Sequence, residues 1–175
     1  MTCRPREHRS FWGSTVKVAA TLKVNGTSYP VEIEPHASLL RAVREQIALT
    51  GTKEGCDDSE CGACMMLLDG EPVNSCSYLA LQAQDREITT VEGLAPPGKL
   101  SGLQQAFLEH GGVQCGFCTP GMLISATALL SRSRTPSEEE VKTALAGNLC
   151  RCTGYEGIVN AVLAEAGRSD AASAG

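Results

Sequence analysis

The sequence predicts an α+β fold in which a strand-rich part comes before a helical part. Apolar side chains occupy every second position over residues 16–24, and Asn25-Gly26 follows directly, a combination that is typical of a β-hairpin. Beyond residues 93–98, which contain two prolines and two glycines, apolar positions recur with the spacing of helices. We therefore expect two domains joined by a linker over residues 93–102.

The first part is expected to form a β-grasp domain over residues 15–92. A return strand with Val31 and Ile33 follows the hairpin turn. Ser38 is a helix N-cap residue in front of an apolar stripe over residues 39–47. The remaining expected elements are strands at 65–68 and 72–73, a turn at 69–70, a helix at 76–83 and a strand at 87–91.

The second part is expected to form a four-helix-bundle-like domain over residues 103–167. Two terminal segments, 1–14 and 168–175, are expected to be flexible, and the last residues of the chain are small and polar. Leu103, Phe107 and Leu108 indicate a first helix that stops at Gly111-Gly112. Thr119-Pro120 starts the second, with proline at the first helical position, and a capping box from Thr135 to Glu138 starts the third. The fourth is expected over residues 157–166.

Charge and hydropathy exclude two classes of function. The net charge of −5 argues against nucleic-acid binding, which needs a clustered basic face. No apolar run approaches the roughly 20 residues of a membrane-spanning helix.

No secretory signal is visible at the start of the chain, and the arginines there are not adjacent as in a twin-arginine signal. We expect a cytoplasmic protein.

Eight of the nine cysteines form two quartets of different spacing. Four thiolates are the donor set of a 2Fe–2S cluster, and C-x4-C-x2-C is the spacing of plant-type ferredoxins. Both quartets lie beside small residues that leave room for a tightly wrapped loop. Two clusters and no other catalytic constellation indicate an electron relay. The quartets are Cys56-x4-Cys61-x2-Cys64-x11-Cys76 and Cys115-x2-Cys118-x31-Cys150-x1-Cys152.

Other uses of the cysteines are weaker interpretations. A single C-x2-C pair is equally typical of a zinc site, but two full quartets, one with ferredoxin spacing, favour iron and sulfide. A disulfide scaffold of a small secreted protein is disfavoured by the missing signal peptide and by the close Cys150-x1-Cys152 pair. The ninth cysteine, Cys3, is expected to be a free thiol.

Polar residues beside the cysteines allow two interpretations each. The acidic side chains of the first loop, Glu54, Asp57, Asp58 and Glu60, either mark a docking face for a redox partner or keep a loop soluble. Gln114 and Arg151 flank cysteines of the second quartet. Each of these two either contacts a partner or hydrogen-bonds the loop backbone.

Three motifs together resemble one known family. GTKEGCDDSECGACMMLLDG, QCGFCTPGM and GNLCRCTGY are similar to segments of the small iron–sulfur subunit of the molybdenum hydroxylases. That group includes xanthine dehydrogenase, aldehyde oxidoreductase, aerobic carbon monoxide dehydrogenase and 4-hydroxybenzoyl-CoA reductase. The resemblance covers about residues 16–166, and the order of the motifs is far more specific than any single C-x2-C.

The resemblance implies two 2Fe–2S clusters on this chain, one for each quartet. The plant-ferredoxin-like domain would bind the cluster facing the flavin, and the helical domain the cluster nearer the molybdenum cofactor. Gln114 matches the glutamine that hydrogen-bonds the pterin, and Cys152 the cysteine whose neighbourhood touches it. Molybdopterin and FAD would lie on a large and a medium partner subunit, in a dimer of heterotrimers.

The expected function is therefore electron transfer within an oxidoreductase complex, by a subunit that does not bind the substrate. Electrons would pass one at a time between the molybdopterin centre and FAD. Two alternatives belong to other classes: a free-standing two-cluster ferredoxin and a zinc-bound interaction module.

Overall fold

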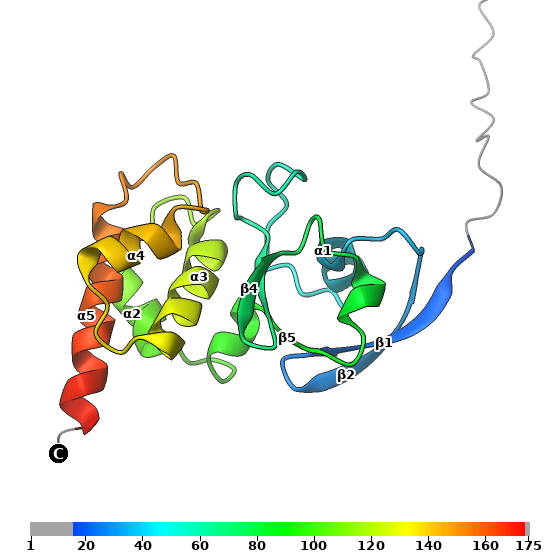
Figure 1. Ribbon diagram of the computed structural model, residues 1–175, viewed down its shortest axis with the longest axis horizontal. Helices are drawn as coiled ribbons and strands as arrows, with labels where there is room; N and C mark the ends of the chain where they lie inside the picture. The colour runs from blue at the N-terminus through cyan, green and yellow to red at the C-terminus, as the bar shows by residue number, and fades with distance from the viewer. Residues whose placement is uncertain (1–15, 174–175) are drawn as a thin grey trace, which may run out of the picture.

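The computed structural model describes residues 16–173, with only the backbone described for residues 169–173. A sheet with short helices lies at one end of the molecule and four longer helices at the other (Figure 1), so the α+β prediction is confirmed. The segment 1–14, with Cys3, lies outside the described residues. Within the described residues, no helix is both long and apolar enough to cross a membrane.

Five strands form one sheet in the order β2-β1-β5-β3-β4. Strand β1 runs parallel to β5, and the other neighbours are antiparallel. The predicted Asn25-Gly26 turn joins β1 to β2 with φ angles of 51° and 77°, the left-handed conformation that a tight hairpin turn requires. The strands are β1 (Val18–Val24), β2 (Thr27–Ile33), β3 (Met65–Leu68), β4 (Glu71–Asn74) and β5 (Glu87–Thr89).

The helix predicted after Ser38 forms in two pieces, α1 (Leu39–Arg41) and the π-helical turn η1 (Ala42–Gln46). The Ser38 hydroxyl accepts a hydrogen bond from the Arg41 N–H at 3.3 Å, which confirms the N-cap. The apolar side of this helix packs on the sheet and completes the first core. Val16, predicted on the buried face of the hairpin, is 75% exposed because it precedes the first strand.

The helix predicted over residues 76–83 is wrong in its first half. Only η2 (Ala80–Ala83) is helical, and it is a 3₁₀ turn. The carbonyls of Ser75 and Tyr78 instead accept hydrogen bonds from the backbone N–H groups of Leu40 and Leu39. Long-range backbone bonding therefore holds this segment in turns. The strand predicted to end at residue 91 ends at Thr89, and η3 (Val91–Leu94) follows.

Four helices form the second part and enclose a core of their own around Phe107 and Met122. The helix α5 continues to Ser173, beyond the predicted end at residue 166, so residues 168–173 of the expected tail are helical. Arg168 pairs with Glu109 of α2 and supports this extension. The helices are α2 (Gly102–Glu109), α3 (Thr119–Arg132), α4 (Glu138–Leu145) and α5 (Glu156–Ser173).

Three details of the predicted helices are corrected. The N-cap of α3 is Cys118, so Thr119 lies inside the first turn. The capping box of α4 uses Ser137 with Glu140, because these two lie three residues apart directly before the helix, as the motif requires. Leu108, predicted with the apolar stripe of α2, is 56% exposed.

The two parts pack directly on each other through α3 and strand β3. Leu67 of β3 is buried against Ile124 and Ala128 of α3, with Leu94 from the expected linker at the edge. A Cβ atom on Gly121, in the first turn of α3, would lie 2.2 Å from the Gly62 carbonyl oxygen. The backbones of the two parts therefore approach more closely than a side chain at this position allows.

Substitution of Gly121 by alanine is expected to lower the free energy of unfolding by about 1–3 kcal/mol, because the added methyl group meets backbone that cannot rotate away. Chemical denaturation of the complete chain measures this. Gly167→Ala is the matched control: Gly167 is also helical and has nothing within 4 Å of the added atom. The control is expected to leave stability unchanged or to raise it by up to about 1 kcal/mol. Equal effects of the two substitutions would contradict the close approach.

Candidate iron–sulfur sites

The first quartet lies in the long loop before β3 and in the turn after β4. Cys64 and Cys76 are buried, whereas Cys56 and Cys61 are partly exposed. The Cys61 N–H points to the Cys56 sulfur at 3.4 Å. Cys64 interacts with both Cys76 and Cys61. The fold thus brings all four cysteines of this quartet to one place.

The loop around the first quartet follows an unusual backbone path. Asp57, Ser59 and Gly62 have φ angles of 58°, 70° and 68°, in the left-handed region. A Cβ atom on Gly55 would lie 2.7 Å from the Cys61 sulfur, so the expected role of this glycine in leaving room is confirmed. Left-handed backbone at these three positions lets the loop turn tightly between its cysteines.

The second quartet lies where two loops meet, one before α3 and one between α4 and α5. The sulfur atoms of Cys115 and Cys152 are 3.5 Å apart, and both residues are exposed. Cys118 and Cys150 lie deeper and interact with each other. The long spacing of this quartet in the sequence therefore closes into one compact group.

The chemistry of the thiols fits metal ligation. Burial raises the pKa of the Cys64 and Cys118 thiols to about 12, so neither forms a thiolate at neutral pH without a cation. For Cys150, burial acts in the same direction, but hydrogen bonds from Thr153 prevail and lower the pKa of the thiol to about 7. A coordinated metal deprotonates such thiols outright, and a cluster would thereby replace the lost solvation.

The arrangement of the described cysteines bears on the two alternative uses. All eight described cysteines are free of disulfide bonds. No group of three or more His, Cys, Asp and Glu side chains among residues 16–173 is placed to hold a single metal ion. Four cysteines suit either one zinc ion or the two irons of a 2Fe–2S cluster, so the preference for iron and sulfide rests on the spacing of the first quartet.

Several residues that support the cysteines were not predicted as site residues. The Tyr155 hydroxyl accepts a hydrogen bond from the Cys150 N–H at 2.8 Å, and the Thr153 hydroxyl lies 3.1 Å from the Cys150 sulfur. In the first site, Ser75 donates to the Cys64 carbonyl at 2.6 Å. The hydroxyl of Thr119, beside Cys118, is buried with no partner in the described part of the chain. Thr153 and Tyr155 had a signal in the sequence through the GNLCRCTGY motif, and Thr119 through the QCGFCTPGM motif, whereas Ser75 had none.

The flanking polar residues lie at the surface. Gln114 and Arg151 are exposed beside the second quartet, and the structure gives neither a hydrogen bond to the loop backbone. The large apolar side chains of Phe117 and Leu149, 47% and 58% exposed, lie next to the same cysteines in the sequence. These four exposed residues flank cysteines of the second quartet in the sequence, and we call them the second-site rim: Gln114, Phe117, Leu149 and Arg151.

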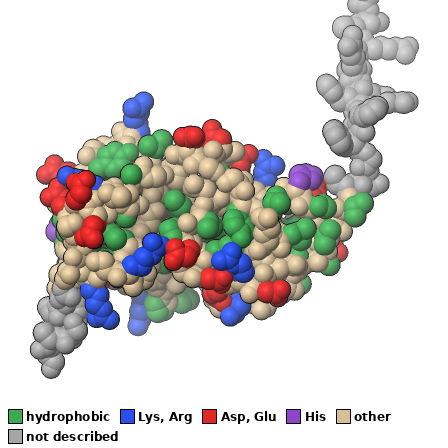
Figure 2. Space-filling model, in the orientation of Figure 1, with side chains coloured by type: hydrophobic (Ala, Val, Ile, Leu, Met, Phe, Trp, Pro, Cys, Tyr) green, Lys and Arg blue, Asp and Glu red, His purple; other side chains and the backbone are tan. Residues whose placement is uncertain are grey.

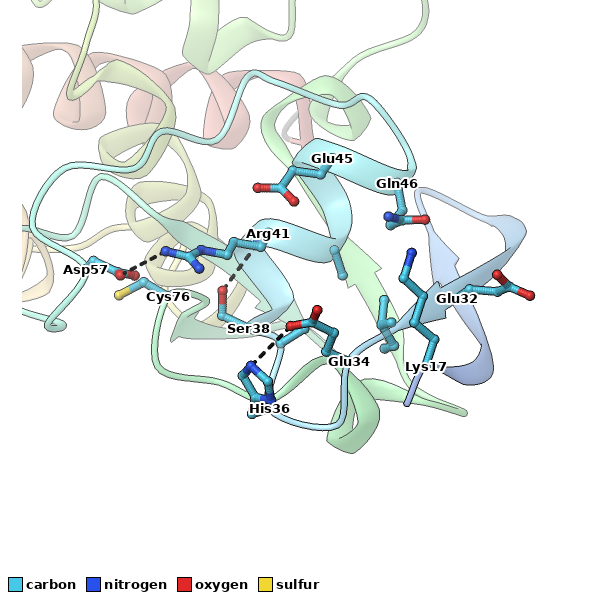
Figure 3. Close-up of a pocket in the computed structure, with 13 residues that line it drawn as sticks. Lys17, Glu32, Glu34, His36, Ser38, Arg41, Glu45, Gln46, Asp57 and Cys76 are labelled. Carbon is cyan, nitrogen blue, oxygen red and sulfur yellow. Dashed lines mark hydrogen bonds and ion pairs between the residues drawn. The ribbon is translucent and has the colours of Figure 1, made fainter. Parts of the chain in front are cut away.

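The acidic loop of the first site is partly neutralised. Arg41 lies 3.5 Å from Asp57 and 3.9 Å from Glu54. Asp57 and Arg41 also line a cavity of about 340 Å³ that reaches Cys76 (Figure 3). Acidic and basic side chains are interspersed over the face seen in Figure 2, without a continuous basic patch on that face. Two of the four acidic residues of this loop, Glu54 and Asp57, thus have a basic partner.

Comparisons with known proteins identify both halves as iron–sulfur domains. Residues 22–95 match the family described as "2Fe-2S iron-sulfur cluster binding domain", and residues 90–163 match the family described as "[2Fe-2S] binding domain". Two such domains in one small chain define an iron–sulfur electron-transfer protein. The prediction of two 2Fe–2S clusters on this chain is thereby confirmed.

Curated relatives specify the family. The small FeS subunit of nicotinate dehydrogenase from Eubacterium barkeri is 50% identical over 139 residues, covering 79% of this chain and 88% of the relative. The iron–sulfur-binding subunit of xanthine dehydrogenase from Escherichia coli O157:H7 is 47% identical over 151 residues, covering 85% and 93%. The chain belongs to the small iron–sulfur subunits of the molybdenum hydroxylases, as the motifs predicted.

Solved structures agree with this assignment. A chain of quinoline 2-oxidoreductase from Pseudomonas putida 86 superposes with a TM-score of 0.85 at 44% identity, covering 89% of this chain and 98% of that one. Aldehyde oxidoreductase from Desulfovibrio gigas gives a TM-score of 0.84 at 39% identity. There the match covers 89% of this chain but only 17% of the other. The same fold thus occurs both as a separate subunit and as part of a much longer chain.

Substitution of Tyr155 by phenylalanine is expected to weaken the second site alone. The Cys150 N–H loses its acceptor, at a cost of about 1 kcal/mol in the free energy of unfolding. The EPR signal of the second cluster should shift while that of the first stays unchanged. Tyr78→Phe is the matched control, since the Tyr78 hydroxyl accepts from Arg86, outside both quartets. A shift of the first signal in Tyr155→Phe would contradict the assignment of Tyr155 to the second site.

Proposed function

We propose that this chain carries electrons one at a time between the molybdopterin centre of a large subunit and the FAD of a medium subunit. It is the iron–sulfur subunit of an oxidoreductase complex and takes no part in binding the substrate. The observation that carries this proposal is that one small chain holds two cysteine quartets whose loops are joined by a backbone hydrogen bond. When bound, each 2Fe–2S cluster supplies a site that accepts and releases one electron.

The ligands of the two clusters are assigned from the two quartets. The buried thiols need a metal to become thiolates, and the loop glycines leave room for a group between the sulfurs. The orphaned hydroxyl of Thr119 would find an acceptor among cluster sulfurs. The proposed ligands are Cys56, Cys61, Cys64 and Cys76 for the first cluster, and Cys115, Cys118, Cys150 and Cys152 for the second.

The two sites touch through the backbone. The Leu149 N–H donates a hydrogen bond to the Cys61 carbonyl at 2.9 Å, and Leu149 directly precedes Cys150. A ligand of the first quartet and a ligand of the second are thus separated by a single residue and one hydrogen bond. Such proximity is what a chain that relays electrons between two partners requires.

The second-site rim is proposed as the contact surface for the large subunit. Cys115 and Cys152 are exposed, and a cluster bound there would be close to the surface. Exposed Phe117 and Leu149 provide apolar area that a partner can cover. Gln114 and Cys152 are proposed to lie against the pterin of the large subunit. The first site, at the other part of the chain, would then face the medium subunit.

The finer organisation of the chain is proposed as well. We assign residues 15–92 to a β-grasp, plant-ferredoxin-like domain, 93–102 to a linker and 103–167 to a four-helix-bundle-like domain. The sheet with α1 and the helices α2–α5 support this division.

The complex is proposed to be a dimer of heterotrimers. The cytoplasm is the proposed compartment, which the eight unbridged cysteines support.

The purified chain is expected to contain four irons and four acid-labile sulfides, and to give two distinct EPR signals after reduction. Cys152→Ser should remove one signal and stop electrons from reaching the flavin in the complex. A Cys76→Ser variant should remove the other signal. Zinc in place of iron, or loss of both signals in each variant, would sink the assignment of the quartets. A monomer that shuttles electrons without any partner would favour the two-cluster ferredoxin instead.

Gln114→Ala is expected to lower the molybdenum content of the purified complex while both EPR signals remain, because the glutamine would no longer hydrogen-bond the pterin. Gln105→Ala is the matched control. Gln105 is also an exposed glutamine but lies on α2, where it bonds to Glu109. Equal molybdenum content and turnover in the two variants would show that Gln114 has no role toward the pterin.

A further inference from the structure

Asn148 is a buried polar residue at the junction of the two cysteine loops. It is 2% exposed and lies two residues before Cys150. Its amide nitrogen donates a hydrogen bond to the Gly62 carbonyl at 3.0 Å, and its amide oxygen accepts one from the Ser125 hydroxyl at 2.7 Å. One side chain therefore connects three segments: the first cysteine loop, helix α3 and the second cysteine loop.

The space around the amide is closed on two sides by glycines. A Cβ atom on Gly62 would lie 2.6 Å from the Asn148 amide nitrogen, and one on Gly121 would lie 2.9 Å from it. Gly62 also has a φ angle of 68°, which side chains other than glycine rarely adopt. The slot holds this amide only because both neighbours lack side chains, so the fit is specific in shape as well as in hydrogen bonding.

The Asn148 side chain adds a second hydrogen bond next to a backbone hydrogen bond between the two cysteine loops. The Leu149 N–H bonds to the Cys61 carbonyl, and the Asn148 amide bonds to the next carbonyl, that of Gly62. A single hydrogen bond between two loops still allows them to rotate about it. Two adjacent bonds fix their relative orientation as well as their distance. A buried polar side chain whose nitrogen and oxygen are both hydrogen-bonded favours one arrangement of the segments it joins.

We propose that Asn148 is a positioning residue that sets the separation and orientation of the two iron–sulfur sites. This inference rests on the proposed function, since it requires that both quartets hold clusters. Ser125 holds the amide in the orientation that aims its N–H at Gly62. Without the amide, the Leu149–Cys61 bond is the remaining hydrogen bond between the two described cysteine loops, and their relative orientation is less tightly fixed.

The test uses the complete complex with Asn148→Ala and Ser125→Ala. Both variants are expected to keep the wild-type iron content and both reduced EPR signals. The magnetic splitting between the two reduced clusters should be altered, and electron transfer from the molybdenum site to the flavin should be slower. The effect should be larger in Asn148→Ala, which loses the bond between the loops, than in Ser125→Ala, which only frees the amide to turn.

Thr90→Val is the control for a loss of stability alone. Thr90 is also fully buried, and its hydroxyl bonds to Asn25 and Glu92 within the first part. This variant should lower the unfolding temperature but leave the magnetic splitting as in the wild type. Wild-type splitting and transfer rate in both Asn148→Ala and Ser125→Ala, with both clusters present, would overturn the proposal. Loss of a cluster in both variants would also overturn it, because Asn148 would then serve folding. Absence of two clusters in the wild type is a separate result and would reject the proposed function.

Discussion

The close approach of backbone to backbone at Gly62 and Gly121 is the constraint on which the rest of the structure depends. At this point the first cysteine loop enters the helical part, and helix α3 begins against it. Two glycines facing each other allow a separation that no side chain permits. The apolar contact of Leu67 with Ile124 and Ala128 extends the same junction along α3. The chain thus has two hydrophobic cores that share one packing interface, and each cysteine quartet lies on its own side of that interface.

The stability of this chain depends on the same cysteines as its function, because its hydrophobic cores are small and its buried thiols need a metal to ionise. Each part has a compact aliphatic core, and the chain contains only 4% aromatic residues. Metal binding that deprotonates buried thiols also stabilises the fold that brings them together. The supporting bonds have the same effect: Tyr155 and Ser75 each satisfy a backbone group beside a cysteine. Folding of the loops and formation of the sites are therefore expected to be coupled.

Local features of the fold could be predicted from the sequence, whereas features set by distant residues could not. The Asn25-Gly26 turn and the Ser38 cap depend on neighbouring residues alone, and both are confirmed. The helix expected at 76–83 failed because N–H groups of Leu39 and Leu40 use carbonyls of that segment. A pattern of apolar residues contains no information about such a partner.

The same distinction applies to the sites. The cysteines could be found from their spacing because a four-thiolate donor set leaves a recognisable pattern. Asn148 belongs to the GNLCRCTGY motif, but its role could not be predicted, since its two hydrogen-bond partners Ser125 and Gly62 lie 23 and 86 residues away in the chain. Two of the predicted helix starts were misplaced by one or two residues, where more than one residue type is able to cap.

The two sites differ in exposure, and this difference affects how readily their thiols oxidise in the free chain. The sulfurs of Cys115 and Cys152 lie 3.5 Å apart at the surface, whereas Cys64 and Cys76 are shielded. A two-electron oxidation would join the exposed pair as a disulfide and remove two thiolates at once. In the free chain the Cys115–Cys152 pair is therefore more open to an external oxidant than the buried Cys64 and Cys76, and a partner bound at the proposed contact surface would cover it.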